Sequence, residues 1–114
     1  MKKLSITLVL FANLLTTNTT FAQESKNVSA FTLVLKSYYE IKDALVTADA
    51  STAATKATVF LAALNAVDLK TLTVNDYKGF VPLKTKLILD AEHIAESKEI
   101  DHQRDHFEIG RAHV

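Results

Sequence analysis

Two stretches in the first half of the chain carry apolar residues at every third or fourth position, the spacing of one face of an α-helix. Ser29, just before the first stretch, is the expected N-cap of the first helix. Asp49 and Ser51 are alternative caps for the second helix. The apolar positions are Phe31, Val34, Leu35, Tyr38, Ile41, Leu45 and Ala48, then Ala53, Ala57, Phe60, Leu61, Leu64 and Val67. The short connector predicts an antiparallel helix pair.

The second half repeats the pattern after a stretch without clear periodicity. We interpret residues 68–81 as a loop with short helical turns and place Pro82 near the start of a third helix. Ser97 is the expected cap of a fourth helix that begins at Lys98. The third stripe is Leu83, Leu87, Ile88, Ala91, Ile94 and Ala95, and the fourth is Ile100, Gln103 or Arg104, and Phe107. The predicted fold is an all-α, up-and-down helical bundle of three helices plus a truncated fourth.

Composition supports a helical fold and excludes several classes of function. The chain has 114 residues with only 2 glycines and 1 proline, too few turn residues for many short strands. It has 13 basic and 13 acidic side chains and 8% aromatics, which argues against a nucleic-acid partner. It contains no cysteine, which excludes disulfides and thiolate chemistry.

The N-terminus has the layout of a secretory signal peptide. Lys2 and Lys3 precede an uncharged, largely apolar run over residues 4–15, and small residues follow at Thr20 and Ala22. The run is well short of the roughly 20 apolar residues that a spanning helix needs. We therefore predict a signal peptide over residues 1–22, cleavage after Ala22, no stable membrane anchor after cleavage, and a periplasmic or secreted protein.

The last residues carry a second non-domain segment. Residues 109–114, IGRAHV, are the translation of ATC GGA AGA GCA CAC GTC, part of a common sequencing-library adapter. We therefore expect residues 108–114 to be a non-native, adapter-derived tail. The helical domain then covers residues 23–107 and is incomplete at its C-terminal end.

Two histidines are the main candidates for chemistry. His102 and His106 are four residues apart on the predicted fourth helix, so both imidazoles project from one face and could share a metal ion. His93 and Glu99 are additional candidate ligands, and Asp105 is an alternative oxygen donor. The alternative interpretation is a solvated polar face in a charge-dense stretch.

A comparison with the zinc-protease motif H-E-x-x-H argues against catalysis. Gln103 stands where that motif has its general base, and an amide cannot accept the proton of a metal-bound water. Arg104 could hold a ligand carboxylate or form helix-surface ion pairs. The sequence has no phosphate loop, nucleophile elbow or serine–histidine–aspartate pattern. We expect a protein without enzymatic activity.

Two stretches, LKSYYEIKDALVTAD over residues 35–49 and IAESKEIDHQRDHF over residues 94–107, resemble the bacterial domain of unknown function 3347 family (DUF3347). The resemblance implies an exported protein, common in Bacteroidetes, and is specific in these two stretches, the second of which contains Ile100, Gln103, Arg104 and Phe107. Family chains continue into a tail containing cysteine and methionine that suits soft metals, which this sequence lacks. Without that tail, the resemblance gives the histidines of this chain no metal role.

Relatives of the domain are attached to periplasmic adaptor subunits of heavy-metal efflux systems. The resemblance therefore implies a non-catalytic accessory in copper-type metal binding or efflux, with periplasmic efflux components as partners. It implies no cofactor in this fragment, and copper or zinc in the full-length protein. The alternative is a structural or protein-interaction bundle with no metal role.

Overall fold

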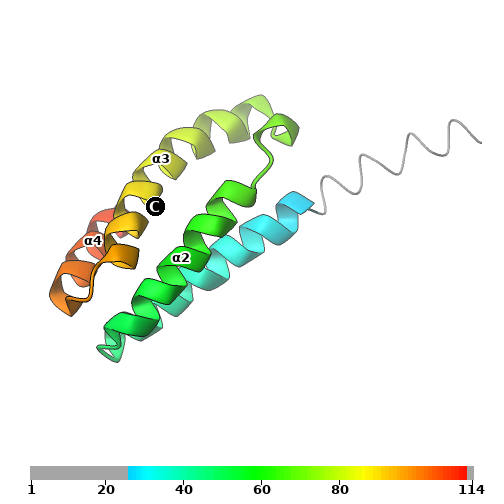
Figure 1. Cartoon of the computed structure of the whole chain (residues 1–114). Helices are drawn as coiled ribbons and strands as arrows, with labels where there is room; N and C mark the ends of the chain where they lie inside the picture. Colours follow the sequence, from blue (N-terminus) through cyan, green and yellow to red (C-terminus); the bar gives the residue numbers. More distant parts are fainter. Residues whose placement is uncertain (1–25, 113–114) are drawn as a thin grey trace, which may run out of the picture.

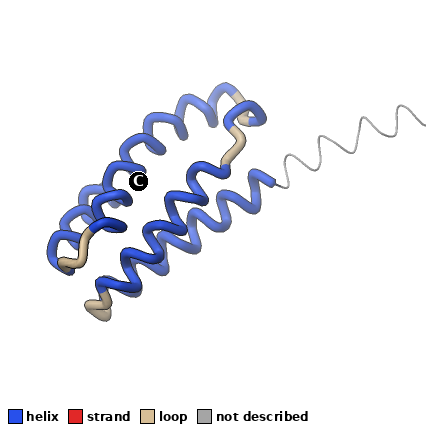
Figure 2. Tube along the Cα trace, in the orientation of Figure 1, coloured by secondary structure: helices blue, strands red, loops and turns tan. Residues whose placement is uncertain are grey.

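The computed structural model describes residues 26–112, which form an all-α bundle of consecutive helices that reverse direction at each connector. A first helix runs through residues 26–46 and is followed by α2 (Ala50–Ala66), the 3-10 helix η1 (Leu69–Thr71), α3 (Val74–Glu96) and α4 (Ile100–Ala112). The connectors are short (Figure 2). The predicted up-and-down helical architecture is confirmed.

The predicted ends of the sequence fall partly outside this description. The signal peptide predicted over residues 1–22 lies outside the described residues, and so do residues 113–114 of the predicted tail. Residues 108–112 continue α4. None of the helices among the described residues is both long enough and apolar enough to cross a membrane.

The first helix begins earlier than the apolar pattern indicates. Ser29 lies inside the helix and is exposed, so its assignment as the N-cap is wrong. The cause is the buried side chain of Asn27, whose Oδ1 accepts a hydrogen bond from the Asp68 amide at 2.9 Å. Asn27 also donates to the Asp68 carbonyl and to the Thr71 hydroxyl. These long-range bonds anchor the described residues just before Ser29 to η1.

The connector between the first two helices has one strained residue and one strong cap. Ala48 has φ of 57°, the left-handed conformation that usually falls to glycine after a helix end. Asp49 then caps α2: its carboxylate accepts the Thr52 amide at 3.0 Å and the Thr52 hydroxyl at 2.7 Å. These two bonds lower the pKa of Asp49, because they stabilise the ionised carboxylate. Of the two alternative caps, Asp49 is the one used.

The third helix is longer than the sequence pattern indicates. Residues 74–81, predicted as part of a loop, are helical, and Pro82 lies well inside α3. The helix starts at a local cap, because Thr73 accepts the Asp76 amide at 3.2 Å and donates its hydroxyl to the Asp76 carboxylate at 2.7 Å. Such a cap contributes about 0.5–2 kcal/mol, which offsets part of the cost of Gly79 and Pro82 in the following turns.

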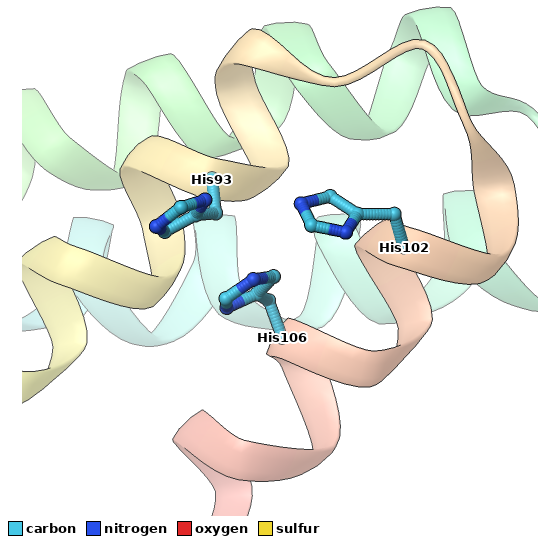
Figure 3. Close-up of side chains that lie close together, drawn as sticks. All are labelled: His93, His102 and His106. Carbon is cyan, nitrogen blue, oxygen red and sulfur yellow. The ribbon is translucent and has the colours of Figure 1, made fainter.

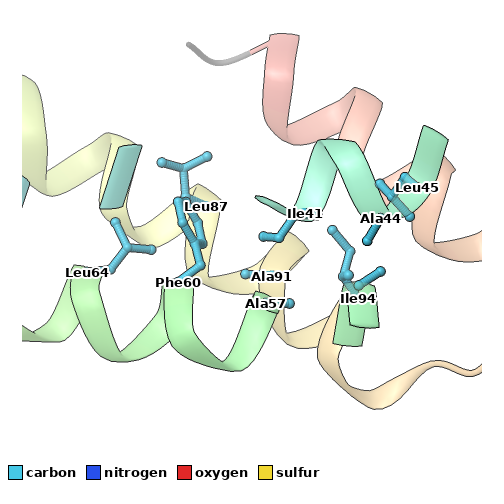
Figure 4. Packing of buried hydrophobic residues seen from close by; sticks show 10 residues of the cluster. Ile41, Ala44, Leu45, Ala57, Phe60, Leu64, Leu87, Ala91 and Ile94 are labelled. Atoms are coloured by element: carbon cyan, nitrogen blue, oxygen red, sulfur yellow. The ribbon is translucent and has the colours of Figure 1, made fainter. Parts of the chain in front are cut away.

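The core forms where the first helix, α2 and α3 meet (Figure 4). Small residues of α2 are completely buried there, including Ala53 and Ala57, which lets the neighbouring helices approach closely. The cluster consists of Ile41, Ala44, Leu45, Ala53, Ala57, Phe60, Leu64, Leu87, Ala91 and Ile94. Phe107 of α4 covers one end, with its ring stacked on Tyr38 at 5.1 Å between centroids.

The fourth helix begins at Ile100, two residues later than predicted. Ser97 ends α3 and also accepts the Glu99 amide at 3.0 Å, so it shapes the connector instead of capping at Lys98. Of the two candidates for the inward face, Gln103 is completely buried and Arg104 is exposed. The short connector turns α4 back along α3, which brings the first turns of one helix beside the last turns of the other.

Candidate metal centre

Three histidines converge in the space between α3 and α4 (Figure 3). His93 comes from the last turn of α3, and His102 and His106 come from successive turns of α4. One potential ligand atom of each ring lies within 4.8 Å of those of the other two. The sequence predicted His102 and His106 as a pair, and the antiparallel return of α4 adds His93 to it.

The rings are close enough to contact one another. His93 and His106 are stacked in parallel with 4.1 Å between centroids, and His102 lies edge-on to His106 at 4.7 Å. His93 and His102 are exposed and His106 is half-buried. A dissolved ion can therefore reach the cluster, and the two exposed rings have room to reorient.

Coordination requires a modest contraction of this cluster. Zinc–nitrogen bonds of 2.0–2.1 Å in a tetrahedron place ligand nitrogens about 3.3 Å apart. The three candidate nitrogens start within 4.8 Å of one another, so rotation of exposed side chains is sufficient. The stacked pair must open, because two rings that bind one ion point toward it rather than lie face to face. Three imidazoles then leave one coordination position for water or another ligand.

A carboxylate supports the cluster from the protein interior. Asp90 Oδ1 lies 3.0 Å from His106 Nδ1, and only 9% of the Asp90 side chain is exposed. Asp90 was not among the residues predicted for this site. A signal was present, because Asp90 occupies a position between Leu87 and Ile94 on the apolar stripe of α3, where a charged residue needs a partner.

The predicted oxygen ligands do not belong to this group. Among the described residues, the cluster that could hold an ion consists of the three histidines alone, so Glu99 and Asp105 lie outside it. Both are exposed. The donor set that the fold brings together is therefore all nitrogen.

Gln103 fixes the position of α4 behind the site. Its Nε2 lies 3.0 Å from the carbonyl oxygen of Ala50, 3.1 Å from that of Ile94 and 3.0 Å from that of Ser97. One buried amide thus joins α4 to the start of α2, to the end of α3 and to the connector after α3. The sequence analysis considered Gln103 only as a residue that cannot act as a base.

Arg104 also stabilises the bundle and is not part of the histidine cluster. Its Nε and Nη2 donate to the carbonyl of Leu45, at 3.2 and 2.8 Å, where the first helix ends. Its Nη1 is 3.6 Å from Asp101 Oδ1, an exposed pair that contributes little to stability. Of its two predicted roles, the surface ion pair is present, joined by the bonds to Leu45.

Comparison with known proteins identifies a family but no characterised relative. The family model described as "Protein of unknown function (DUF3347)" matches residues 34–110. This range includes the core, both helices of the histidine cluster, Asp90 and Gln103. Neither a curated protein nor a solved structure matches the chain.

Proposed function

Because the chain belongs to the DUF3347 family, whose description carries no activity, we propose its function from the histidine cluster: a non-catalytic helical domain that binds a copper- or zinc-type ion. The observation that carries this proposal is the convergence of His93, His102 and His106 on one space. Histidines that were merely part of a solvated polar face would not need to come together from two helices.

The donor chemistry narrows the ion to borderline divalent metals. Imidazole nitrogens suit zinc and copper(II), whereas magnesium and calcium require oxygen ligands. A soft copper(I) ion prefers sulfur, and the sequence has no cysteine and a single methionine, Met1. Copper(II) should bind more tightly than zinc at such a site, following the general order of divalent affinities.

The absence of catalysis is part of the proposal and is supported by Gln103. In a zinc hydrolase a carboxylate beside the ligands accepts a proton from the metal-bound water. Here the residue between the two α4 histidines is a buried amide held by three carbonyls. Such a residue neither reaches the ion nor accepts a proton.

A role outside the cytoplasm, alongside periplasmic efflux components, completes the proposal. It rests on the signal-peptide pattern of residues 1–22 and on the family resemblance. Mass spectrometry of the exported protein tests the first part. The expected mature chain starts at Gln23, and a chain that keeps residues 1–22 in the cytoplasmic fraction would contradict it.

Isothermal titration of the full chain, purified without a histidine tag, tests metal binding. Zinc-finger peptides bind zinc with a free energy of about 10–16 kcal/mol, shared among four ligands. The loss of one ligand should therefore weaken binding roughly 100-fold. We expect one ion per chain, and this loss in H102Q.

Two variants serve as matched controls for that titration. E99Q alters the candidate ligand that lies outside the cluster, and H113Q removes the remaining histidine of the chain. Both should bind like the wild type. No binding by the wild type, or an equal loss in E99Q and H102Q, would overturn the proposal.

A second candidate, a protein-interaction bundle without a metal role, is favoured by an apolar line on the first helix. Val28, Leu35, Tyr39 and Val46 are 66%, 55%, 53% and 74% exposed. Successive residues of this line are separated by two helical turns, one turn and two turns, so the spacing is symmetric about its middle. A second copy of the chain, packed antiparallel about a two-fold axis, would therefore place Val28 against Val46 and Leu35 against Tyr39.

Sedimentation analysis tests this second candidate. The wild type should dimerise with increasing concentration and L35E should not. L89E is the matched control, because Leu89 is 57% exposed on α3 and not on the first helix. A wild type that stays monomeric at every concentration would contradict this candidate.

A further inference from the structure

Asp90 is a buried acid whose position is explained by one histidine. It lies on α3, one helical turn before His93, and faces α4 at the level of His106. Among the described residues, Asp90 makes one hydrogen bond to a side chain: its Oδ1 lies 3.0 Å from the Nδ1 of His106. An ionised side chain at this depth is costly unless it is paired.

The chemistry of this contact decides which nitrogen of His106 faces the site. A carboxylate only accepts hydrogen bonds, so the Nδ1 of His106 carries the proton and donates it. The other nitrogen, Nε2, then keeps its lone pair and lies on the side of the ring opposite Asp90. That is the form of imidazole that binds a metal ion.

We infer that Asp90 is the positioning residue of the metal centre, fixing the ring and the tautomer of His106 so that Nε2 is its ligand atom. The inference rests on the proposed metal-binding function. It also ranks the three ligands. His106 is held in place before the ion arrives, whereas His93 and His102 are exposed and neither ring makes a hydrogen bond within the described part of the chain.

This ranking gives His106 the role of anchor ligand. The nitrogen of His106 is already in position, whereas the two mobile rings lose freedom when they bind. His106 should therefore contribute most to the affinity for the ion. H106Q should therefore weaken binding more than H93Q or H102Q. If His106 were not held in place before the ion arrives, the three nitrogens would contribute alike and no such order would be seen.

Zinc titration of D90N and D105N tests the inference on the full chain. Carboxylates behind a ligating histidine typically contribute 10–100-fold to metal affinity, so D90N should bind about 10–100-fold more weakly. D105N is the matched control: Asp105 is exposed, adjoins His106 in sequence and loses the same unit of charge. It should stay close to the wild type.

A second readout keeps the test decisive if D90N folds poorly. Long-range proton–nitrogen NMR of the metal-free wild type reports which nitrogen of each imidazole is protonated. We expect His106 to be protonated at Nδ1, and in D90N we expect a mixture of the two tautomers. If Asp90 only stabilised the fold, the zinc affinity would not change together with the tautomer of His106.

The outcomes separate the two proposals. If the wild type binds zinc through the three histidines and D90N binds equally tightly, the role of Asp90 is refuted and the metal function stands. A wild-type His106 protonated at Nε2 refutes it as well. If the wild type binds neither zinc nor copper, both proposals fall.

Discussion

Replacing Gln103 with leucine should destabilise the bundle by about 2 kcal/mol. The side chain is completely buried, and its Nε2 lies within hydrogen-bonding distance of the carbonyls of Ala50, Ile94 and Ser97. Leucine is apolar and removes both N–H donors, but its side chain is one carbon shorter than that of glutamine. The loss therefore reports mainly on hydrogen bonding, with a smaller contribution from packing.

The magnitude follows from the burial of each acceptor. The contact with Ile94 is buried, and a buried acceptor left unpaired costs about 1–3 kcal/mol. The contacts with Ala50 and Ser97 are part-buried, so water can replace the amide there at about 0.5–1.5 kcal/mol each. Against this, Gln103 Oε1 is buried without a partner, and leucine removes that cost of about 1–3 kcal/mol.

Urea unfolding followed by circular dichroism measures the change. With a urea dependence of about 1–3 kcal/mol/M, typical of small proteins, the midpoint should fall by about 1–2 M. D105L, an exposed change on the same helix, is the control and should shift the midpoint little. A Q103L protein as stable as the wild type would refute the view that this amide holds α4 to the start of α2 and the end of α3.

Two further predictions concern the connector at residues 47–49. The pKa of Asp49 is lowered by the Thr52 amide and hydroxyl, so its contribution to stability is complete above its ordinary pKa of about 3.9 and is lost as pH falls through the lower folded value. The stability difference between wild type and D49A should therefore shrink in that acid range, and a difference independent of pH in urea titrations would contradict the cap. A48G should raise the free energy of unfolding by up to about 1 kcal/mol, and the thermal midpoint with it. The reason is that Ala48 has φ of 57°, a conformation that glycine adopts freely. A lower midpoint for A48G in calorimetry would show that the residue is not strained.

The helices could be predicted from sequence wherever their signals are local. The cap at Asp49 and the stripes of α2 and α3 involve residues within a few positions of one another, and the structure has them as expected. The start of the first helix could not be predicted, because it depends on Asn27 bonding to Asp68 across the bundle. Residues 74–81 were predicted as part of a loop because of their β-branched residues, an Asn-Asp pair and Gly79, yet they are helical behind the Thr73–Asp76 cap.

The candidate site shows the same division. His102 and His106 follow from one helical spacing, and His93 joins them because a three-residue connector folds α4 back on α3. Asp90 and Gln103 act on partners in other elements, so their roles became visible only with the packing. Glu99 is close to the histidines in sequence, but it is exposed and lies outside the cluster.

X-ray absorption at the zinc edge, on the zinc-loaded full chain without a tag, tests the central claim most directly. We expect a first shell with three imidazole nitrogens at 2.0–2.1 Å and one oxygen ligand, and loss of the imidazole signal in the triple variant H93Q/H102Q/H106Q. A shell made only of oxygen ligands, or an unchanged spectrum in the triple variant, would contradict a metal centre between α3 and α4.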